Sequence, residues 1–199
     1  ASLLADLTLT LIRNDSDTPF IASDTPVVLH NRLYEGQRVS VAGYANVGLQ
    51  MFLPLGPRLA LFGYDCAAYA VQAASDDIVT IDDGAQIRLI NDLQWEAAHA
   101  VLLVSPDMPE TELRSSAANW EAHRGTERAV YREEIVSQSD TEMRPRHGSG
   151  EAPSTVLLDL SFITCLLPAP ALLDPWEIPP FRDAERIARV DQAFEWLDD

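Results

Sequence analysis

Short apolar runs separated by turn residues fill the first third of the chain, and they limit what it can fold into. In the run 4–12, Leu7, Leu9 and Leu11 alternate with polar residues, which is typical of a half-buried strand. Four more runs are too short for helices, and we expect strands at 20–22, 27–29, 49–53 and 58–64. The connections between these runs are short, which favours antiparallel pairing. The first third therefore predicts a mostly antiparallel sheet.

Helical spacing is clearest after Asp83, which we expect to be the N-cap of a helix over 84–99. A second helix is expected over 109–124 with Thr111 as its cap, and a third over 181–197. The third is amphipathic, because one stripe carries Ile187, Val190, Phe194 and Leu197. Further strands are expected at 78–81, 101–104, 130–136 and 155–160. Together these elements predict an α+β fold with a mixed, mostly antiparallel sheet and two or three packed helices.

Two segments are expected to lack regular structure. Pro54-Leu55-Gly56-Pro57 joins two apolar runs, and its prolines should sit at strand ends because proline donates no ladder hydrogen bond. Residues 137–154 are rich in Ser, Asp, Arg, Pro and Gly and show no periodicity, so we expect a mobile loop there.

The length of 199 residues is that of a single domain, so we expect one α+β domain over residues 1–199. The chain starts at Ala1 without a methionine, which leaves open that the domain is the C-terminal part of a longer protein.

The charge balance is strongly acidic, with 31 acidic residues against 14 basic ones and a net charge of −17. All of the basic residues are arginines, which fits either a GC-rich genome or adaptation to high salt. A field this negative repels phosphate backbones, so binding to nucleic acid and to anionic membranes is disfavoured. A partner with a basic surface stays open.

The cysteines and histidines suggest neither a metal nor a cofactor. Cys66 and Cys165 lie in apolar runs without metal-type spacing, so we expect buried free thiols, as in a reducing cytoplasm. The four histidines show no spacing typical of a structural zinc site. No apolar stretch approaches the length of a transmembrane helix, so we expect a soluble, cytoplasmic protein.

Three sequence blocks carry a family resemblance. The run Pro19-Phe20-Ile21-Ala22-Ser23-Asp24-Thr25-Pro26-Val27-Val28 resembles a hallmark, "pFitSDnPvv", of the bacterial domain of unknown function four-two-three-eight (DUF4238). The block 48–57 is similar to its "ifPLsp" block, and Asn91-Asp92-Leu93-Gln94 is similar to its "lN.lQ" helix. The blocks occur in the right order and span about residues 4–104.

The resemblance implies a grouping and a fold, and it brings no established activity. Members of the family usually carry a further N-terminal region with a His-Tyr-x-Pro-like segment, which this chain does not contain. The chain therefore resembles the C-terminal portion of the family. Its expected partners are that missing N-terminal region or another protein.

The segment Ser23-Asp24-Thr25-Pro26 permits a structural and a functional interpretation. Asp24 can bond a nearby backbone N–H in an Asx-turn, and Pro26 biases Thr25 toward extended geometry. The segment would then form a kink between two strand pieces. A kinked strand could instead point Asp24 and Ser23 into a cleft as a metal ligand, general base or anion contact. We favour the structural interpretation.

The helix expected over 84–99 carries the second group of candidates. Asn91, Trp95 and His99 recur at every fourth residue and so share one face, with Gln94 beside Asn91. The amides could satisfy buried backbone groups, or they could form the polar wall of a pocket that faces Ser23 and Asp24. The candidate site residues are therefore Ser23, Asp24, Asn91, Gln94 and His99, and an isolated histidine such as His30 is not among them.

Two hypotheses for the function follow from these patterns. The first is a non-catalytic scaffold or interaction domain, because the sequence contains no Walker loop, nucleophile elbow or dinucleotide fingerprint. The alternative is a hydrolase or nuclease-like enzyme whose site includes Asp24 and the Asn91–His99 helix face.

Overall fold

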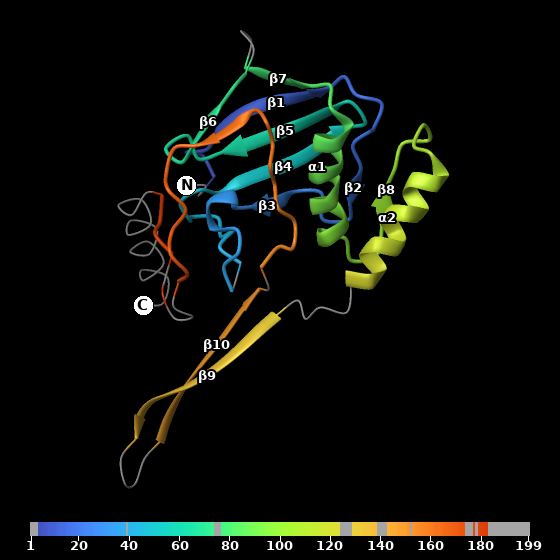
Figure 1. Cartoon of the computed structure of the whole chain (residues 1–199). Coiled ribbons are helices and arrows are strands. Elements are labelled where there is room, and N and C mark those ends of the chain that lie inside the picture. The colour runs from blue at the N-terminus through green and yellow to red at the C-terminus, as the bar shows by residue number, and fades with distance from the viewer. Residues whose placement is uncertain are drawn as a thin grey trace, which may run out of the picture.

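The computed structural model describes residues 4–38, 40–73, 77–123, 129–138, 143–151, 153–173, 177 and 179–182, and only the backbone between 121 and 151. Five strands form the main sheet, in the order β3 (Val28–His30), β4 (Gln50–Gly56), β5 (Leu59–Tyr64), β1 (Thr8–Asn14) and β7 (Ile78–Ile81) (Figure 1). β7 runs parallel to β1, and the other neighbours in this sheet are antiparallel. The predicted α+β fold with a mixed, mostly antiparallel sheet is therefore confirmed.

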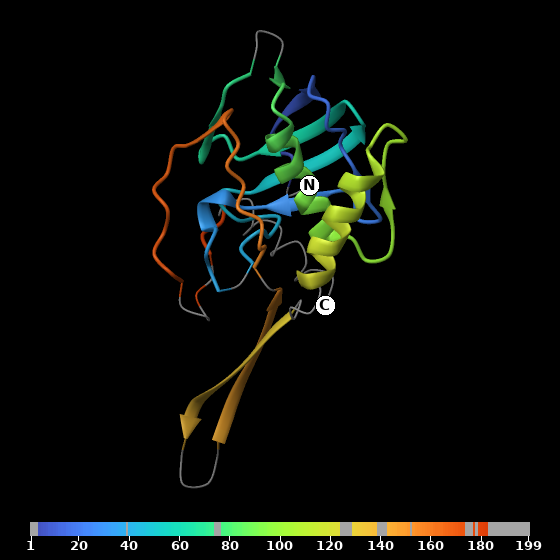
Figure 2. The same ribbon diagram turned by 45° about the vertical axis from the view of Figure 1, so that its right-hand side comes forward.

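The helix α1 (Gly84–Ala97) follows β7 and lies across one face of the sheet (Figure 2). The side chain of Asp83 accepts a hydrogen bond from the Ala85 N–H, so the predicted N-cap is confirmed. Ile87, Ile90 and Leu93 are buried at helical spacing. They meet the buried sheet residues Ile12, Phe52, Ala60, Phe62, Val79 and Ile81 in one apolar core.

Residues 153–162 cross the same side of the sheet as an extended segment rather than as a strand. The prediction of a strand over 155–160 is wrong, although Val156, Leu158 and Leu160 do alternate with exposed neighbours and enter the core. The backbone finds side-chain acceptors in place of a ladder: Thr155 N–H donates to Glu96 at 2.7 Å. The Ser161 N–H likewise donates to the Gln86 side chain at 2.9 Å.

The expected burial of alternating leucines is wrong within β1, although Leu7, just before the strand, is buried. The buried side chains are Thr10, Ile12 and Asn14, whereas Leu9 and Leu11 lie on the opposite face. A shift of one residue exchanges the two faces of a strand. Backbone carbonyls satisfy the polar core positions: the Thr10 hydroxyl donates to the Asp77 carbonyl, and the Asn14 amide donates to the Thr18 carbonyl at 2.7 Å. The leucines of this strand are thereby turned away from the core.

Small elements complete the described chain. Two strand pairs flank the sheet. One joins β2 (Ala22–Ser23) with β8 (Leu102–Leu103), and the other joins β6 (Tyr69–Val71) with β11 (Ile163–Cys165). A short 3-10 helix, η1, spans Arg32–Tyr34.

The helix α2 (Glu110–His123) packs on α1, where the Trp120 indole donates to Asp92 at 3.4 Å. Thr111 lies inside α2 and is not its cap.

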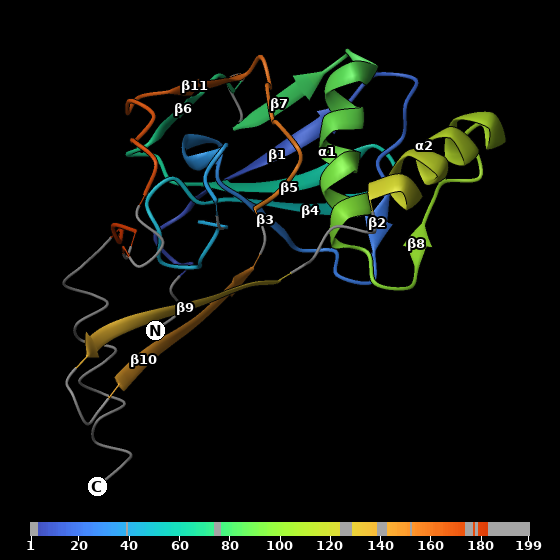
Figure 3. The same cartoon turned by 60° about the horizontal axis from the view of Figure 1, so that its bottom comes forward.

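The hairpin β9 (Ala129–Gln138) and β10 (Met143–Glu151) extends away from the main sheet (Figures 1 and 3). The structure differs here from the expected loop over 137–154, because nine residues of that segment form β10 and pair with β9. The strand expected over 130–136 lies within β9.

Three further sequence predictions are corrected. Pro54 lies inside β4 rather than at its end. It comes after the last residue of β4 that pairs with β3, so the N–H that proline lacks is not needed for a hydrogen bond there. Cys66 and Cys165 are exposed rather than buried, because Cys66 occupies the turn after β5 and Cys165 ends β11. Both are free thiols.

The predicted C-terminal helix lies almost entirely outside the described residues. Its first position, Phe181, forms a β-bridge with Asn46. In the part of the chain that the structure describes, no helix has both the length and the apolar character needed to cross a bilayer.

Candidate functional site

Ser23 and Gln94 meet at the point where the hallmark segment crosses α1. Gln94 is fully buried, and its carbonyl oxygen accepts from both the N–H and the hydroxyl of Ser23 at 2.9 Å. The amide nitrogen of Gln94 donates to the Pro26 carbonyl at 2.9 Å. This one side chain therefore holds both ends of the Ser23–Pro26 turn, as a neighbouring strand would.

Asn91 performs the same task one turn earlier along α1. Its carbonyl oxygen accepts from the Ile21 N–H at 3.0 Å, and its amide nitrogen donates to the Pro19 carbonyl at 2.9 Å. Buried backbone groups must find partners, and this extended segment finds them on a helix. The two amides together fasten residues 19–26 to α1.

Asp24 ties the same segment to the residues just after α1. Its two carboxylate oxygens accept from the N–H groups of His99 and Ala100, each at 2.9 Å. The hydrogen bond from the His99 backbone is the main cause that holds the pKa of Asp24 below its usual range. The Thr25 hydroxyl approaches the His99 ring at 3.4 Å, and Asp24 and His99 are both exposed.

The structure thus brings Ser23, Asp24, Asn91, Gln94 and His99 together, and most of the hydrogen bonds of their side chains are to backbone groups. The shared helix face does not extend as expected, because α1 ends at Ala97 and His99 lies beyond it. Trp95 is half-buried. We call the set of contacts from Asn91, Gln94 and Asp24 to the two backbone segments 19–26 and 99–100 the hallmark clamp.

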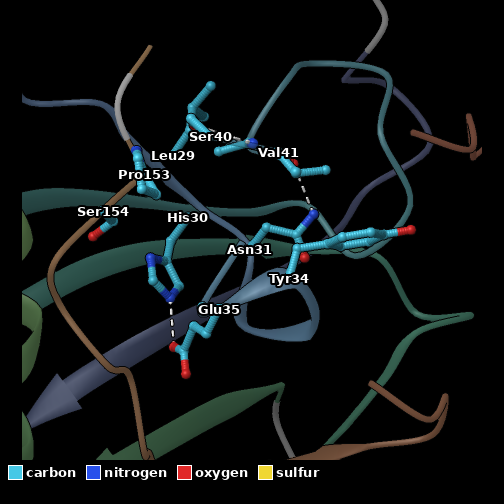
Figure 4. Close-up of a pocket in the computed structure, with 11 residues that line it drawn as sticks. Leu29, His30, Asn31, Tyr34, Glu35, Ser40, Val41, Pro153 and Ser154 are labelled. Carbon is cyan, nitrogen blue, oxygen red and sulfur yellow. Dashed lines mark hydrogen bonds and ion pairs between the residues drawn. The ribbon is translucent and has the colours of Figure 1, made fainter. Parts of the chain in front are cut away.

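A small cavity lies at the end of β3, and no sequence candidate points to it (Figure 4). His30, which is only 2% exposed, lies between Glu35 and the Pro153–Ser154 segment. The cavity measures about 40 Å³, enough for a group of a few atoms. The sequence does contain a signal for the burial of His30, which is the alternation of side chains along β3. His30 lies two residues after the buried Val28 and therefore faces the core as well.

Glu35 fixes the orientation of the His30 ring. Its Oε1 lies 2.8 Å from His30 Nε2 and also accepts from the Leu158 N–H at 2.7 Å. Because a carboxylate only accepts, Nε2 carries a proton, and in the neutral ring Nδ1 then presents a lone pair. Among the described residues, His30 Nδ1 has no hydrogen-bond partner, and neither has Nε2 of Gln50, the cross-strand neighbour of His30. In the neutral ring, His30 Nδ1 can accept a hydrogen bond from a small donor in the cavity, whereas Gln50 Nε2 can only donate one.

The opposite side of the main sheet presents a third feature, an apolar surface. α1 and the segment 153–162 lie on one side of the sheet in Figures 1 and 2, and no helix of the described part lies over the other side. We call the apolar side chains there the open face: Leu9, Leu11, Leu29, Met51, Leu53, Leu61 and Ile78.

Strand register arranges the open face in rows. Leu9, Gly63, Met51 and Leu29 are successive cross-strand partners in the first row. Ile78, Leu11, Leu61 and Leu53 form the second. A Cβ added at Gly63 would lie 3.0 Å from Met51 Cε and 3.2 Å from Leu9 Cδ2, so these side chains close over the glycine. Leu9 is 53% exposed, and the second-row leucines are partly exposed.

Comparison with curated proteins finds no match, and comparison with solved structures finds none either. A family model, described as a protein of unknown function, matches residues 1–107. The match includes the five-stranded sheet, α1 and every residue of the hallmark clamp. The matched part covers more than half of the chain, and the chain belongs to the family of proteins of unknown function DUF4238.

Proposed function

We propose that this domain is a non-catalytic interaction module, which binds an amphipathic helical segment of another polypeptide through the open face of its sheet. The observation that carries the proposal is the open face itself. Seven apolar side chains lie in register over five strands and are left partly or largely exposed.

A contiguous apolar surface of this kind favours binding because water leaves it on association. Single exposed leucines are common, whereas extended patches mark interaction sites. In many folds a second layer of helices covers the other face of a sheet whose first face already carries a helix. The open face is the kind of surface that such a layer would cover. With a net charge of −17, the domain attracts a helix whose apolar stripe is flanked by basic residues.

The hallmark clamp supports this proposal by providing a structural role for the family motif. Both carboxylate oxygens of Asp24 are bonded to backbone N–H groups. Its lowered pKa makes it a weak general base, which weighs against a hydrolase centred on this residue. The clamp holds the segment 19–26 and α1 in place behind the sheet, and so keeps the sheet rigid.

Peptide binding tests the proposal directly. The probe is a fluorescently labelled synthetic helix of leucine and lysine, about 15 residues long. Its leucines recur at i, i+3, i+4 and i+7. Leu61→Asp places a charge at the centre of the open face and should weaken binding about tenfold or more. The control is Leu157→Asp, which makes the same charge change at a residue that is 65% exposed in the segment on the other side of the sheet.

The control removes the contribution of general attraction between a basic peptide and an acidic protein. If Leu61→Asp and Leu157→Asp bind the peptide equally well, the open face is not the binding surface and the proposal is wrong.

A further inference from the structure

We infer that the cavity beside His30 is a binding site for a small primary ammonium group, such as the ammonium ion or the end of a short alkylamine. The site is distinct from the open face, because Leu29 and His30 are neighbours in β3 and their side chains point to opposite sides of the sheet. The inference therefore does not rest on the proposed function. It rests on an unsatisfied acceptor, the charge beside it and the size of the space.

The unsatisfied acceptor is Nδ1 of His30. The residue is 2% exposed, and in the part of the chain that the structure describes this nitrogen has no hydrogen-bond partner. Figure 4 shows it on the side of the ring that is turned away from Glu35. Glu35 holds the other ring nitrogen at 2.8 Å, which fixes the ring and makes Nδ1 a stronger acceptor. Because an unpaired buried acceptor costs free energy, a donor that enters the cavity is stabilised there.

The side-chain donors around the cavity are mostly engaged elsewhere. The Asn31 amide gives its two hydrogens to backbone carbonyls, at 2.9 and 2.8 Å. The Ser154 hydroxyl gives its hydrogen to Glu96 at 2.5 Å. The Ser40 hydroxyl also lines the cavity, and it can accept as well as donate. A ligand that only donates hydrogen bonds, as an ammonium group does, therefore suits the cavity better than one that accepts them.

Charge favours a cation over a neutral donor. Glu35 lines the cavity, and no arginine is among the described residues that line it. Attraction to this carboxylate acts at short range, and the net charge of −17 adds to it. The Glu35 side chain is 22% exposed, so a charged ligand can reach it from solvent.

The size of the cavity limits the ligand to very few non-hydrogen atoms. The volume of about 40 Å³ accepts an ammonium or methylammonium ion, whereas a longer amine would leave its chain outside. A ligand this small binds no more tightly than about the millimolar range. It would contact the end of β3, the turn after η1 and the segment 153–154, and binding to these distant parts of the chain would stabilise the fold.

Nitrogen-15 NMR of the histidine rings tests the inference on the whole chain. The probe is methylammonium chloride, and the control salt is tetramethylammonium chloride, which has the same charge and no N–H. At about pH 8 free imidazole is neutral and an alkylammonium ion is charged. We expect the His30 Nδ1 signal to shift saturably with methylammonium, with a millimolar dissociation constant, while the signals of the exposed His99 do not respond.

A pair of matched variants tests the contribution of charge. Glu35→Gln keeps an acceptor for the ring and removes the charge, so it should raise the dissociation constant about tenfold. The control is Glu110→Gln, the same change at a side chain that is 74% exposed, which should leave the constant unchanged within about twofold.

A His30 signal that does not shift, or that shifts equally with tetramethylammonium, would overturn the inference, because the cavity would then hold water alone. A shift with sodium formate in place of methylammonium would also overturn it, since Nδ1 would then carry a proton and donate to an anion. If Glu35→Gln does not fold, the titration of the wild type decides by itself. Peptide binding to the open face is measured separately, so either result can fail without the other.

Discussion

Gln94 of α1 and Ser23 of β2 are joined by two hydrogen bonds of 2.9 Å, from the backbone N–H and from the hydroxyl of Ser23 to one carbonyl oxygen. The contact links residues 71 positions apart, one in the hallmark segment and one on the helix behind the sheet. A side chain thereby takes the place of a neighbouring strand, and the clamp it belongs to holds the layers of the domain together.

Gln94→Leu should strongly destabilise the fold. The leucine is similar in size, but it leaves the buried Ser23 N–H and the partly buried Pro26 carbonyl without their partner. Each unsatisfied group costs about 1–3 kcal/mol, so we expect a loss of roughly 2–5 kcal/mol in the free energy of unfolding, measured with urea. Gln72→Leu, the same change at an exposed residue, should cost less than about 0.5 kcal/mol. Equal effects of the two substitutions would mean that the clamp does not stabilise the fold.

Asp24 should make this end of the clamp sensitive to acid. Its pKa is lowered in the folded state, chiefly by the hydrogen bond from the His99 N–H. Its contribution to stability is therefore complete above the unfolded pKa of about 3.9, and it is lost as the pH falls through the lower folded pKa. The amide shifts of His99 and Ala100, followed by NMR, should titrate with a midpoint below that of an ordinary aspartate.

The control for this titration is Asp24→Asn, in which the acid-dependent shift of both amides should vanish. A wild-type midpoint at or above the ordinary value for aspartate would show that the carboxylate does not hold these two N–H groups in solution.

Asp92 should behave in the opposite way. Burial is the main cause that raises its pKa, with the Trp120 indole acting against it. A raised folded pKa means that the charged carboxylate is disfavoured in the fold, so wild type gains stability as the pH falls toward that pKa. Asp92→Asn keeps an acceptor for Trp120 and removes the charge, and should raise the urea midpoint at pH 7.

The advantage of Asp92→Asn over wild type should shrink as the pH is lowered, which distinguishes it from a general effect of reduced negative charge. Asp17→Asn, at an exposed residue, makes the same charge change and should not show this pH dependence. A lower midpoint for Asp92→Asn at pH 7 would show that the charge itself stabilises the contact between α1 and α2.

Glu35 should be essential for the environment of His30. It is the acceptor for two buried donors, His30 Nε2 and the Leu158 N–H. Glu35→Ala leaves both unpaired and should cost roughly 2–5 kcal/mol in the free energy of unfolding. Glu35→Gln retains an acceptor oxygen and should cost clearly less. If the two variants are equally stable, the shared acceptor has no structural importance.

Much of this fold could be predicted because its signals are local. Asp83, the helix that follows it and the strand at 78–81 are all where their capping and periodicity place them. The meeting of the hallmark segment with Asn91 and Gln94 was also expected. That their amides bond backbone was one of two open interpretations, because the same side chains could equally have lined a pocket.

The open face could not be predicted for a physical reason. The alternation of Leu7, Leu9 and Leu11 predicts a buried face, and only the tertiary register shows that the core takes Thr10, Ile12 and Asn14 instead. The polar side chains at these core positions are acceptable because distant residues bond them, as Asp77 does for Thr10. Such partners are invisible in a local pattern, and so is the cavity at His30.

The most direct test of the binding surface uses two of the methionines as built-in probes. Met51 lies in the first row of the open face, whereas Met108 lies in the turn before α2. With ¹³C-methyl methionine labelling, the NMR signal of Met51 should shift or broaden when the leucine and lysine peptide is added, while that of Met108 stays in place. A bound peptide that leaves the Met51 signal unchanged would contradict the account, because the partner would then lie elsewhere on the molecule.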